Sequence, residues 1–311
     1  MDKPNVTLFA AKGRDSLSQA HCAALEAVAQ VNYQSVLHTL PEAELIAHCN
    51  SAHYIALTRR VSKNFDSRMI EQLPQLRGLS IYATGSEWID VEALQERAIR
   101  FTYLPDYCLT AVAEHTLAML LTFSRRLHLS DRIARDELPK TVSIRGWELA
   151  GKKLGIIGMG RIGQRVASLA SAFGMSVSYT DPQVPVVPGF QVMAWEDLLA
   201  QSDVLVLTAS MDRKNPIVLN TEAIARMKNG VYVINTARAD MVDKHAMLRA
   251  LLSKQVHGYG VDDYVFSDQE MAQLEHGRVL QSGHSAWYSN EAMQRGTDMW
   301  VDNLLKMIRE Q

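Results

Sequence analysis

Short apolar runs recur along the first third of the chain, and segments with helical periodicity separate them. The runs have the length of buried parallel strands, which show little polar–apolar alternation because both of their faces are covered. In one intervening segment, Leu17, Ala20, Ala24 and Val28 recur at helical spacing. The pattern predicts a small layered α/β unit. Strands are expected at 6–10, 32–37, 54–57, 79–83 and 100–104, and helices at 15–30, 41–49, 66–73 and 90–97.

A longer helix is expected at 109–126, because this stretch is rich in Ala, Leu and Met and is apolar nearly all round. Such a helix should be buried, either in a core or at an interface. The segment at 130–147 is charged and irregular, and no element is expected there. Strand–helix alternation then restarts. Strands are expected at 153–158, 176–180, 203–208, 230–235, 258–262 and 279–282, and helices at 161–174, 195–201, 221–228, 243–254 and 289–309, the last capped by Ser289 or Asn290.

Length and composition narrow the class of protein. A chain of 311 residues is too long for one ordinary core and favours two domains. The formal net charge is −2 and no basic run is present, which argues against nucleic acid or an anionic membrane as partner. Cys22, Cys49 and Cys108 are widely spaced and form no metal-ligand pattern, as in a reducing compartment. The run at 6–10 is too short for a signal sequence or membrane span, so we expect a cytoplasmic protein without a metal site.

A glycine motif of the form G-x-G-x-x-G lies between an expected strand and an expected helix. This context makes it a dinucleotide-binding turn rather than a chance match. Gly158 permits the tight turn, Gly160 lets the backbone approach a pyrophosphate, and Gly163 lets helix and strand pack closely. The helix then begins at Arg161 and Ile162, where backbone amides and the helix dipole favour phosphate. The alternative is a purely structural strand–turn–helix unit.

Asp181 lies at the end of the next expected strand after the glycine motif, at 176–180. A carboxylate there accepts hydrogen bonds from a ribose 2′-hydroxyl and repels a 2′-phosphate. The following Pro182 and Gln183 offer no arginine for such a phosphate. The cofactor is therefore expected to be NAD rather than NADP. The structural alternative is that Asp181 only caps a strand–turn–helix unit and contacts no cofactor.

Four further segments occur in a fixed order along the chain. They are V-A-E-H-T at 112–116, W-E-L-A-G-K-K-L-G-I-I-G at 147–158, N-T-A-R at 235–238 and G-H-S-A-W at 283–287. Together they resemble the landmarks of the D-2-hydroxyacid dehydrogenase family, which includes glyoxylate and hydroxypyruvate reductases. The resemblance implies an α/β protein with two parallel-sheet, Rossmann-like or flavodoxin-like domains. A nucleotide domain at 105–284 would be inserted into a substrate domain formed by 1–104 and 285–311, and the protein would be a homodimer joined largely through the segment after Ala113.

The resemblance assigns catalytic roles to Arg238 and His284. Arg238 follows the expected strand at 230–235, where a guanidinium group can bind a substrate carboxylate at two points. His284 matches the family's acid–base histidine, and an imidazole suits that role because its ordinary pKa lies near working pH. The alternatives without a catalytic role are that Arg238 is an exposed charge and that His284 is a structural or exposed histidine. The same resemblance places Thr208, Ala237 and Asp262 against the cofactor, and Asp262 would lie near the nicotinamide carboxamide.

The chain departs from the family at the glutamate that holds the far nitrogen of the histidine. Counting from Asp262, that position falls on Ser267, which carries no charge. Asp268 or Glu270 is a candidate to supply a carboxylate from a reshaped loop, and Glu270 is favoured of the two. The other interpretation is that no carboxylate replaces the glutamate.

The substrate-loop position of the family is occupied here by Thr84 and Gly85, whose successive backbone amides suit an anionic group. Arg59 and Arg60 follow the strand at 54–57 and are candidates for a second anionic group of the substrate, or else a solvated pair.

Trp88 and Trp287 are candidates to line the substrate pocket, although a large aromatic side chain more often belongs to a core. The predicted activity is hydride transfer between NAD and a small D-2-hydroxyacid or 2-oxoacid. Two alternatives stay open, and the serine at the glutamate position motivates the first of them. One is a non-catalytic NAD(H)-sensing protein, and the other is an epimerase or lyase that uses tightly held NAD for an internal redox step.

Overall fold

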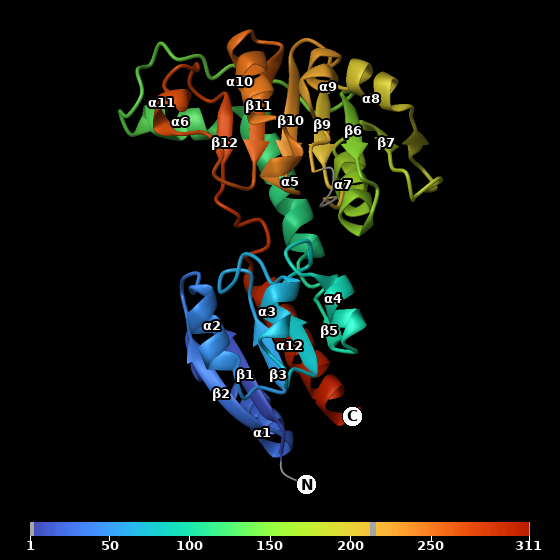
Figure 1. Ribbon diagram of the computed structural model, residues 1–311. Coiled ribbons are helices and arrows are strands. Elements are labelled where there is room, and N and C mark those ends of the chain that lie inside the picture. The colour runs from blue at the N-terminus through green and yellow to red at the C-terminus, as the bar shows by residue number, and fades with distance from the viewer. Residues whose placement is uncertain (1–2, 212–215, 311) are drawn as a thin grey trace. The chain divides into compact units, whose positions relative to one another are not determined.

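A computed structural model describes residues 3–211 and 216–310. Its contacts divide the chain into two units, which are Met1–Cys108 with Ser289–Gln311, and Leu109–Tyr288. The boundaries fall at 108 and 288, where 104 and 284 were expected. Each unit is built from parallel strands with helices packed around them, as Figure 1 shows, and the predicted α/β class is confirmed.

The first unit contains a five-stranded parallel sheet in the order β2-β1-β3-β4-β5. This is the flavodoxin-like order, in which the direction of winding changes between β1 and β3 and leaves a crevice at their carboxyl ends. Every residue of β3 and β4 is buried, as their apolar runs predicted. The elements are β1 (Asn5–Ala10), η1 (Gly13–Ser16), α1 (Gln19–Val28), β2 (Gln30–Ser35), α2 (Glu42–Cys49), β3 (Tyr54–Leu57), α3 (Ser67–Glu71), β4 (Gly78–Ile81), α4 (Val91–Glu96) and β5 (Arg100–Thr102).

The carboxyl-terminal helix α12 (Asn290–Arg309) completes the first unit. Ser289 is its N-cap, accepting a hydrogen bond from the Ala292 amide at 3.2 Å, which confirms one of the two predicted caps. The helix packs on α1, β4 and β5. The buried Trp300 indole donates a hydrogen bond to the Ser80 carbonyl at 3.3 Å and fixes the helix against the sheet.

The second unit contains a seven-stranded parallel sheet in the order β12-β11-β10-β9-β6-β7-β8. Counted from its own first strand, this is the Rossmann order with one added strand, and the direction of winding changes between β6 and β9. The elements are α5 (Leu109–Arg125), α6 (Leu127–Ala134), β6 (Lys153–Ile157), α7 (Arg161–Ala172), β7 (Ser176–Thr180), β8 (Gln191–Val192), α8 (Trp195–Gln201), β9 (Val204–Leu207), α9 (Thr221–Ala225), β10 (Val231–Asn235), η2 (Ala239–Met241), α10 (Lys244–Leu252), β11 (Val256–Val261), α11 (Asp268–Met271) and β12 (Val279–Gln281).

Some expectations for this unit were wrong. The stretch at 130–147 is not wholly irregular, because α6 reaches Ala134 after a left-handed residue, Arg126, separates it from α5. Within its own unit, helix α5 is buried along one side and Glu114 and Ala118 are exposed, so its expected burial at an interface stays a prediction. The short α11 and β8 had no apolar periodicity to predict them. Among the described helices, none is both long and apolar enough to cross a membrane.

Candidate nucleotide-binding and active site

The three glycines of the motif have three different structural reasons. Gly158 directly follows β6 with φ of +94°, and a Cβ there would lie 2.4 Å from the backbone of Ala209. A Cβ on Gly163 would lie 2.2 Å from the Gly158 carbonyl oxygen. A Cβ on Gly160 would meet no heavy atom within 4 Å. Gly158 and Gly163 therefore serve the fold of the turn, whereas Gly160 leaves open space at the start of α7.

The glycine turn is fixed across the point where the sheet changes its direction of winding. The Thr208 hydroxyl, just after β9, donates a hydrogen bond to the Gly158 carbonyl at 2.7 Å. The side-chain amide of Gln164 donates a hydrogen bond to the Met159 carbonyl at 3.1 Å. Gly160 is the N-cap of α7 and has no side chain to cap the helix. A phosphate is a natural partner for the first amides of such a helix.

Asp181 follows β7 and faces the glycine turn. Its Oδ2 accepts a hydrogen bond from the Met159 amide at 2.7 Å, and its Oδ1 accepts from the Gln183 and Val184 amides at 2.8 and 3.1 Å. A carboxylate offers about four lone-pair positions, so one acceptor position is left after these three bonds. The open approach at Gly160 and this carboxylate together fit a dinucleotide with a free ribose hydroxyl.

Arg238 is presented by a turn that Asn235 shapes. Asn235 ends β10 and is 1% exposed. Its side-chain oxygen accepts from the Ala237 amide at 3.0 Å, and its side-chain nitrogen donates to the Arg238 carbonyl at 2.8 Å and to the Tyr259 hydroxyl at 3.3 Å. The Arg238 guanidinium donates to the Ala237 carbonyl at 2.9 Å. Asn235 was part of a quoted segment but was missed as a functional residue.

His284 lies in a turn after β12 and is exposed. It has a left-handed backbone, with φ of 60°, directly after Gly283 with φ of 61°. The Trp287 indole donates to the His284 carbonyl at 2.9 Å, and the Tyr264 ring occupies the space that a Cβ on Gly283 would need. Trp287 therefore lies beside the histidine, and its role as a lining residue stays a prediction.

Asp262 directly follows β11, which lies between the strands that precede Arg238 and His284. It is 7% exposed, and its carboxylate binds the turn around the histidine. The Ser282 hydroxyl and the Ser285 amide donate to Oδ1 at 2.7 Å each, and the Ala286 amide donates to Oδ2 at 3.0 Å.

Glu270 is occupied by contacts of its own loop. Ser267 is the N-cap of α11 and forms a reciprocal capping box with Glu270, whose Oε2 accepts from the Ser267 amide at 2.8 Å. Its Oε1 pairs with Lys244 Nζ at 2.9 Å. The hydrogen bond from Lys244 is the main cause that lowers the pKa of Glu270 to about 2. The Gln281 side chain holds the preceding residues by accepting from the Val265 and Phe266 amides at 2.7 Å each.

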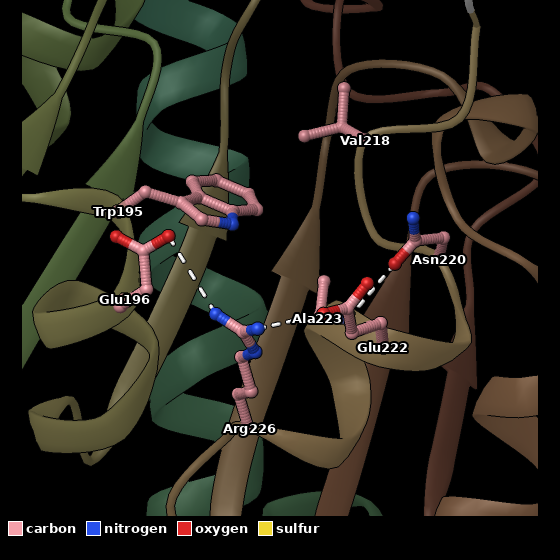
Figure 2. A pocket seen from close by; sticks show the side chains of 7 residues that line it. All are labelled: Trp195, Glu196, Val218, Asn220, Glu222, Ala223 and Arg226. Atoms are coloured by element: carbon pink, nitrogen blue, oxygen red, sulfur yellow. Dashed lines mark hydrogen bonds and ion pairs between the residues drawn. The ribbon is translucent and has the colours of Figure 1, made fainter.

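A separate pocket of the second unit lies between α8 and α9, and Figure 2 shows its lining. Arg226 lies in it and pairs with Glu222 at 2.7 Å and with Glu196 at 3.6 Å. The two carboxylates outnumber the single guanidinium, so these three side chains carry a net charge of −1. None of the sequence-predicted site residues lines it. The lining residues are Trp195, Glu196, Val218, Asn220, Glu222, Ala223 and Arg226.

In the first unit, the candidate substrate loop follows β4. Trp88 is 3% exposed and donates its indole N–H to the Gly85 carbonyl at 3.2 Å, so it is a core residue that fixes the loop rather than a lining residue. The Thr84 hydroxyl lies 3.4 Å from Cys108 Sγ. Arg59 follows β3 and pairs with Glu87 at 2.9 Å. That pairing reduces the net charge that Arg59 offers to an anion.

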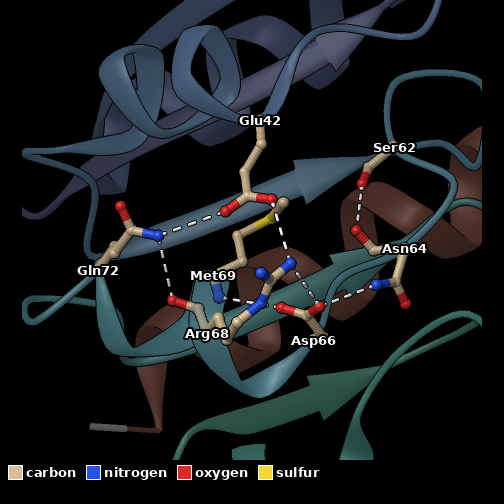
Figure 3. Close-up of polar contacts among 7 residues, drawn as sticks. All are labelled: Glu42, Ser62, Asn64, Asp66, Arg68, Met69 and Gln72. Atoms are coloured by element: carbon tan, nitrogen blue, oxygen red, sulfur yellow. Dashed lines mark hydrogen bonds and ion pairs between the residues drawn. The ribbon is translucent and has the colours of Figure 1, made fainter.

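The chain after Arg60, which is exposed, is held by a polar network shown in Figure 3. The Ser62 hydroxyl donates a hydrogen bond to the backbone carbonyl of Asn64 at 2.7 Å. The side-chain amide of Asn64 donates to the Asp66 carboxylate at 3.0 Å. Asp66 caps α3 by accepting from the Met69 amide at 3.1 Å, and this bond is the main cause that lowers the pKa of Asp66. The network therefore holds in place the segment that follows Arg59 and Arg60, at the crevice of the first sheet.

These features define a nucleotide-binding Rossmann unit with charged and imidazole side chains at the carboxyl edge of its sheet. The sequence matches the family described as "D-isomer specific 2-hydroxyacid dehydrogenase, NAD binding domain" over residues 117–286. It is 31% identical to a 2-hydroxyacid dehydrogenase homolog of Haemophilus influenzae over 79% of this chain and 81% of that protein. It is 30% identical to a glyoxylate reductase of Pyrococcus furiosus over 82% of this chain and 79% of that protein.

Among solved structures, D-lactate dehydrogenase from Aquifex aeolicus in complex with NAD and lactic acid has a TM-score of 0.82 and 28% identity. The alignment covers 98% of this chain and 96% of that one. The chain belongs to the D-isomer specific 2-hydroxyacid dehydrogenase family. It is an NAD-dependent oxidoreductase, and the comparisons do not favour the sensor or the epimerase and lyase alternatives.

Proposed function

We propose that the protein reduces a small 2-oxoacid with NADH, and oxidises the D-2-hydroxyacid in the reverse direction, with Arg238 and His284 as its catalytic residues. One observation carries the proposal. Arg238, Asp262 and His284 follow β10, β11 and β12, which are three adjacent parallel strands, so they share the carboxyl edge of one sheet. Ligands of open α/β sheets bind at that edge.

The residues of the second unit divide the work. The amides at Arg161 and Ile162 bind the pyrophosphate beside Gly158, Gly160 and Gly163, and Thr208 holds that turn. The Asp181 carboxylate accepts a hydrogen bond from a ribose hydroxyl. When bound, the nicotinamide supplies or takes the hydride. The backbone at Ala237 belongs to the same edge.

Arg238 binds the substrate carboxylate at two points and polarises the adjacent carbonyl group. His284 donates a proton to the alkoxide oxygen in reduction and takes the hydroxyl proton in oxidation. Glu270 stabilises its own loop and takes no part in proton transfer, because Lys244 and Ser267 already bind its carboxylate. In the first unit, Thr84, Gly85, Arg59 and Arg60 are the proposed substrate contacts, and Trp287 is proposed as a lining residue in the second.

The test is the pair of variants Arg238→Ala and Arg238→Lys, with Arg226→Ala, at the C-cap of α9, as the matched control. Loss of two charge-assisted hydrogen bonds of about 1.5–3 kcal/mol each should lower kcat/KM by about 10²–10⁴-fold. A panel of 2-oxoacids is followed by NADH absorbance. The control should stay near wild type. An Arg238→Ala enzyme with wild-type kcat/KM would refute the role of Arg238.

We further propose a cytoplasmic homodimer. Cys22, Cys49 and Cys108 are all free and buried, as suits a reducing compartment. Helix α5 is proposed for the dimer interface, and its exposed face includes Glu114 and Ala118. Light scattering coupled to gel filtration tests this, because a monomer at all concentrations contradicts it.

A further inference from the structure

The turn that carries His284 has an unfavourable backbone. A left-handed conformation costs a residue with a side chain about 1–2 kcal/mol, and His284 has it directly after Gly283. Such a conformation persists only where the surroundings hold it in place. The amides of Ser285 and Ala286, which follow the histidine, both donate to Asp262. Asp262 therefore holds the strained turn from its far side.

The burial of Asp262 supports the same interpretation. A carboxylate that is only 7% exposed requires hydrogen-bond donors to offset the lost hydration. The turn supplies three, from the Ser282 hydroxyl and the Ser285 and Ala286 amides, over a sequence separation of 20 to 24 residues. Carboxylate and turn therefore stabilise each other.

Ser282 extends these contacts to α5. Its hydroxyl has a single proton, which it donates to Asp262 Oδ1 at 2.7 Å. The same hydroxyl oxygen lies 3.0 Å from His115 Nε2, so His115 is the donor in that contact. The hydrogen bonds therefore run from His115 Nε2–H to the Ser282 hydroxyl, and from that hydroxyl to Asp262. They fix Nε2 as the protonated nitrogen of His115, which belongs to the V-A-E-H-T segment at 112–116.

We propose that Asp262, Ser282 and His115 form a positioning relay that sets the orientation of His284. The inference rests on the proposed function, because it deepens the role of the proposed acid–base histidine. It also differs from the contact between Asp262 and the nicotinamide carboxamide that the family resemblance implied. The two assignments separate in experiment. A positioning residue changes kcat, whereas a cofactor contact changes the affinity for NADH.

The variants are Asp262→Asn, Ser282→Ala and His115→Phe, with Asp263→Asn as the matched control. Asp263 is the next residue and accepts only the neighbouring Tyr264 amide among the contacts resolved for it, at 2.8 Å. Asparagine at 262 replaces one acceptor oxygen by an NH₂ group, which breaks at least one bond to the turn. We expect kcat to fall about 10–100-fold, equivalent to about 1.4–2.8 kcal/mol, with the Kd for NADH changed less than about threefold.

Conservative variants test the relay against a general packing effect. Ser282→Thr keeps the hydroxyl and His115→Gln keeps a donor, so both should restore most of the kcat that Ser282→Ala and His115→Phe lose. The proposal is overturned if Asp262→Asn raises the Kd for NADH tenfold or more while kcat at saturating NADH stays unchanged. It is also overturned if the alanine and threonine variants at 282 behave alike.

A readout without turnover separates this proposal from the proposed function. Long-range ¹H–¹⁵N spectra of histidine-labelled protein should show His115 protonated at Nε2, and the His284 ring resonances should shift in Ser282→Ala but not in Asp263→Asn. If wild-type protein reduces no 2-oxoacid, the proposed function fails while these shifts still report the relay. Unshifted His284 resonances in an active, folded Ser282→Ala enzyme refute the relay alone. If Asp262→Asn does not fold, Ser282→Ala and Ser282→Thr carry the test.

Discussion

Alanine substitutions at the three motif glycines should produce three distinguishable defects. Gly163→Ala places a Cβ 2.2 Å from the Gly158 carbonyl oxygen, a backbone atom already bound by Thr208. Gly158→Ala adds a left-handed φ to a contact of 2.4 Å with the Ala209 backbone. Gly160→Ala meets no heavy atom within 4 Å and has an ordinary φ of −67°. The same chemical change therefore tests packing, backbone strain and ligand space separately.

Magnitudes follow from these contacts. Overpacking against a fixed neighbour costs about 1–3 kcal/mol, so Gly163→Ala should lower Tm by about 3–10 °C in a unit of this size. Gly158→Ala should lose about 1–2 kcal/mol more through its left-handed φ. Gly160→Ala should cost about 1 kcal/mol or less, which is the preference of an N-cap for glycine over alanine. Its methyl group would instead meet the pyrophosphate, and the Kd for NADH should rise at least about tenfold.

The assay combines thermal unfolding without ligand and fluorescence titration with NADH. The expected result is a stable Gly160→Ala protein that binds NADH poorly, and a destabilised Gly163→Ala protein. The reasoning fails if Gly160→Ala lowers Tm as much as Gly163→Ala does. It also fails if Gly160→Ala binds NADH with wild-type affinity, because the open space beside that residue would then have no role.

Three further predictions concern residues that shape the site. Trp88→Phe removes the hydrogen bond to the Gly85 carbonyl, which is worth about 1 kcal/mol, so KM for the 2-oxoacid should rise about fivefold in steady-state assays with Tm lowered only slightly; an unchanged KM would contradict the role of the loop. Asn235→Ala leaves the half-buried Ala237 amide without its acceptor, and urea unfolding should show a loss of about 1–3 kcal/mol together with a lower kcat/KM. Glu270 has its pKa lowered to about 2, so its stabilisation is complete above the unfolded pKa of about 4.3 and is lost as pH falls toward 2. Glu270→Gln should therefore destabilise the protein at pH 7, approach wild-type stability near pH 2–3, and leave the pH–rate profile at about pH 6–9 unchanged, whereas a displaced profile would assign Glu270 to proton transfer.

The apolar runs predicted most strands because they are short, which favours a strand buried on both faces over a buried helix. β3 was expected at 54–57 and is Tyr54–Leu57, with every residue buried. β2 was expected at 32–37 but is Gln30–Ser35. It lies at the edge of the sheet, no residue of it is fully buried, and its sequence constrains its register weakly.

The contacts that shape the candidate site were harder to predict, since they join residues far apart in sequence. The bonds of Asp262 to Ser282 and Ser285 depend on how β11 and β12 are paired. One local signal was available and was read differently. Serine at 267 and glutamate at 270 have the spacing of a capping box, which predicts a helix start, but Glu270 was considered only as a partner of the histidine.

Helix α12 has a consequence for the order in which the chain acquires its structure. The first unit needs this helix, because Trp300 binds the Ser80 carbonyl and the Met307 carbonyl accepts a hydrogen bond from Arg100 at 3.0 Å. The second unit is continuous from Leu109 to Tyr288 and contains all of its own strands. During synthesis every strand of the second unit is made before the last helix of the first unit. The nucleotide-binding unit is thus able to fold without any residue after 288, whereas the first unit needs α12, and a chain truncated before residue 289 would leave β4 and β5 without the cover that α12 provides.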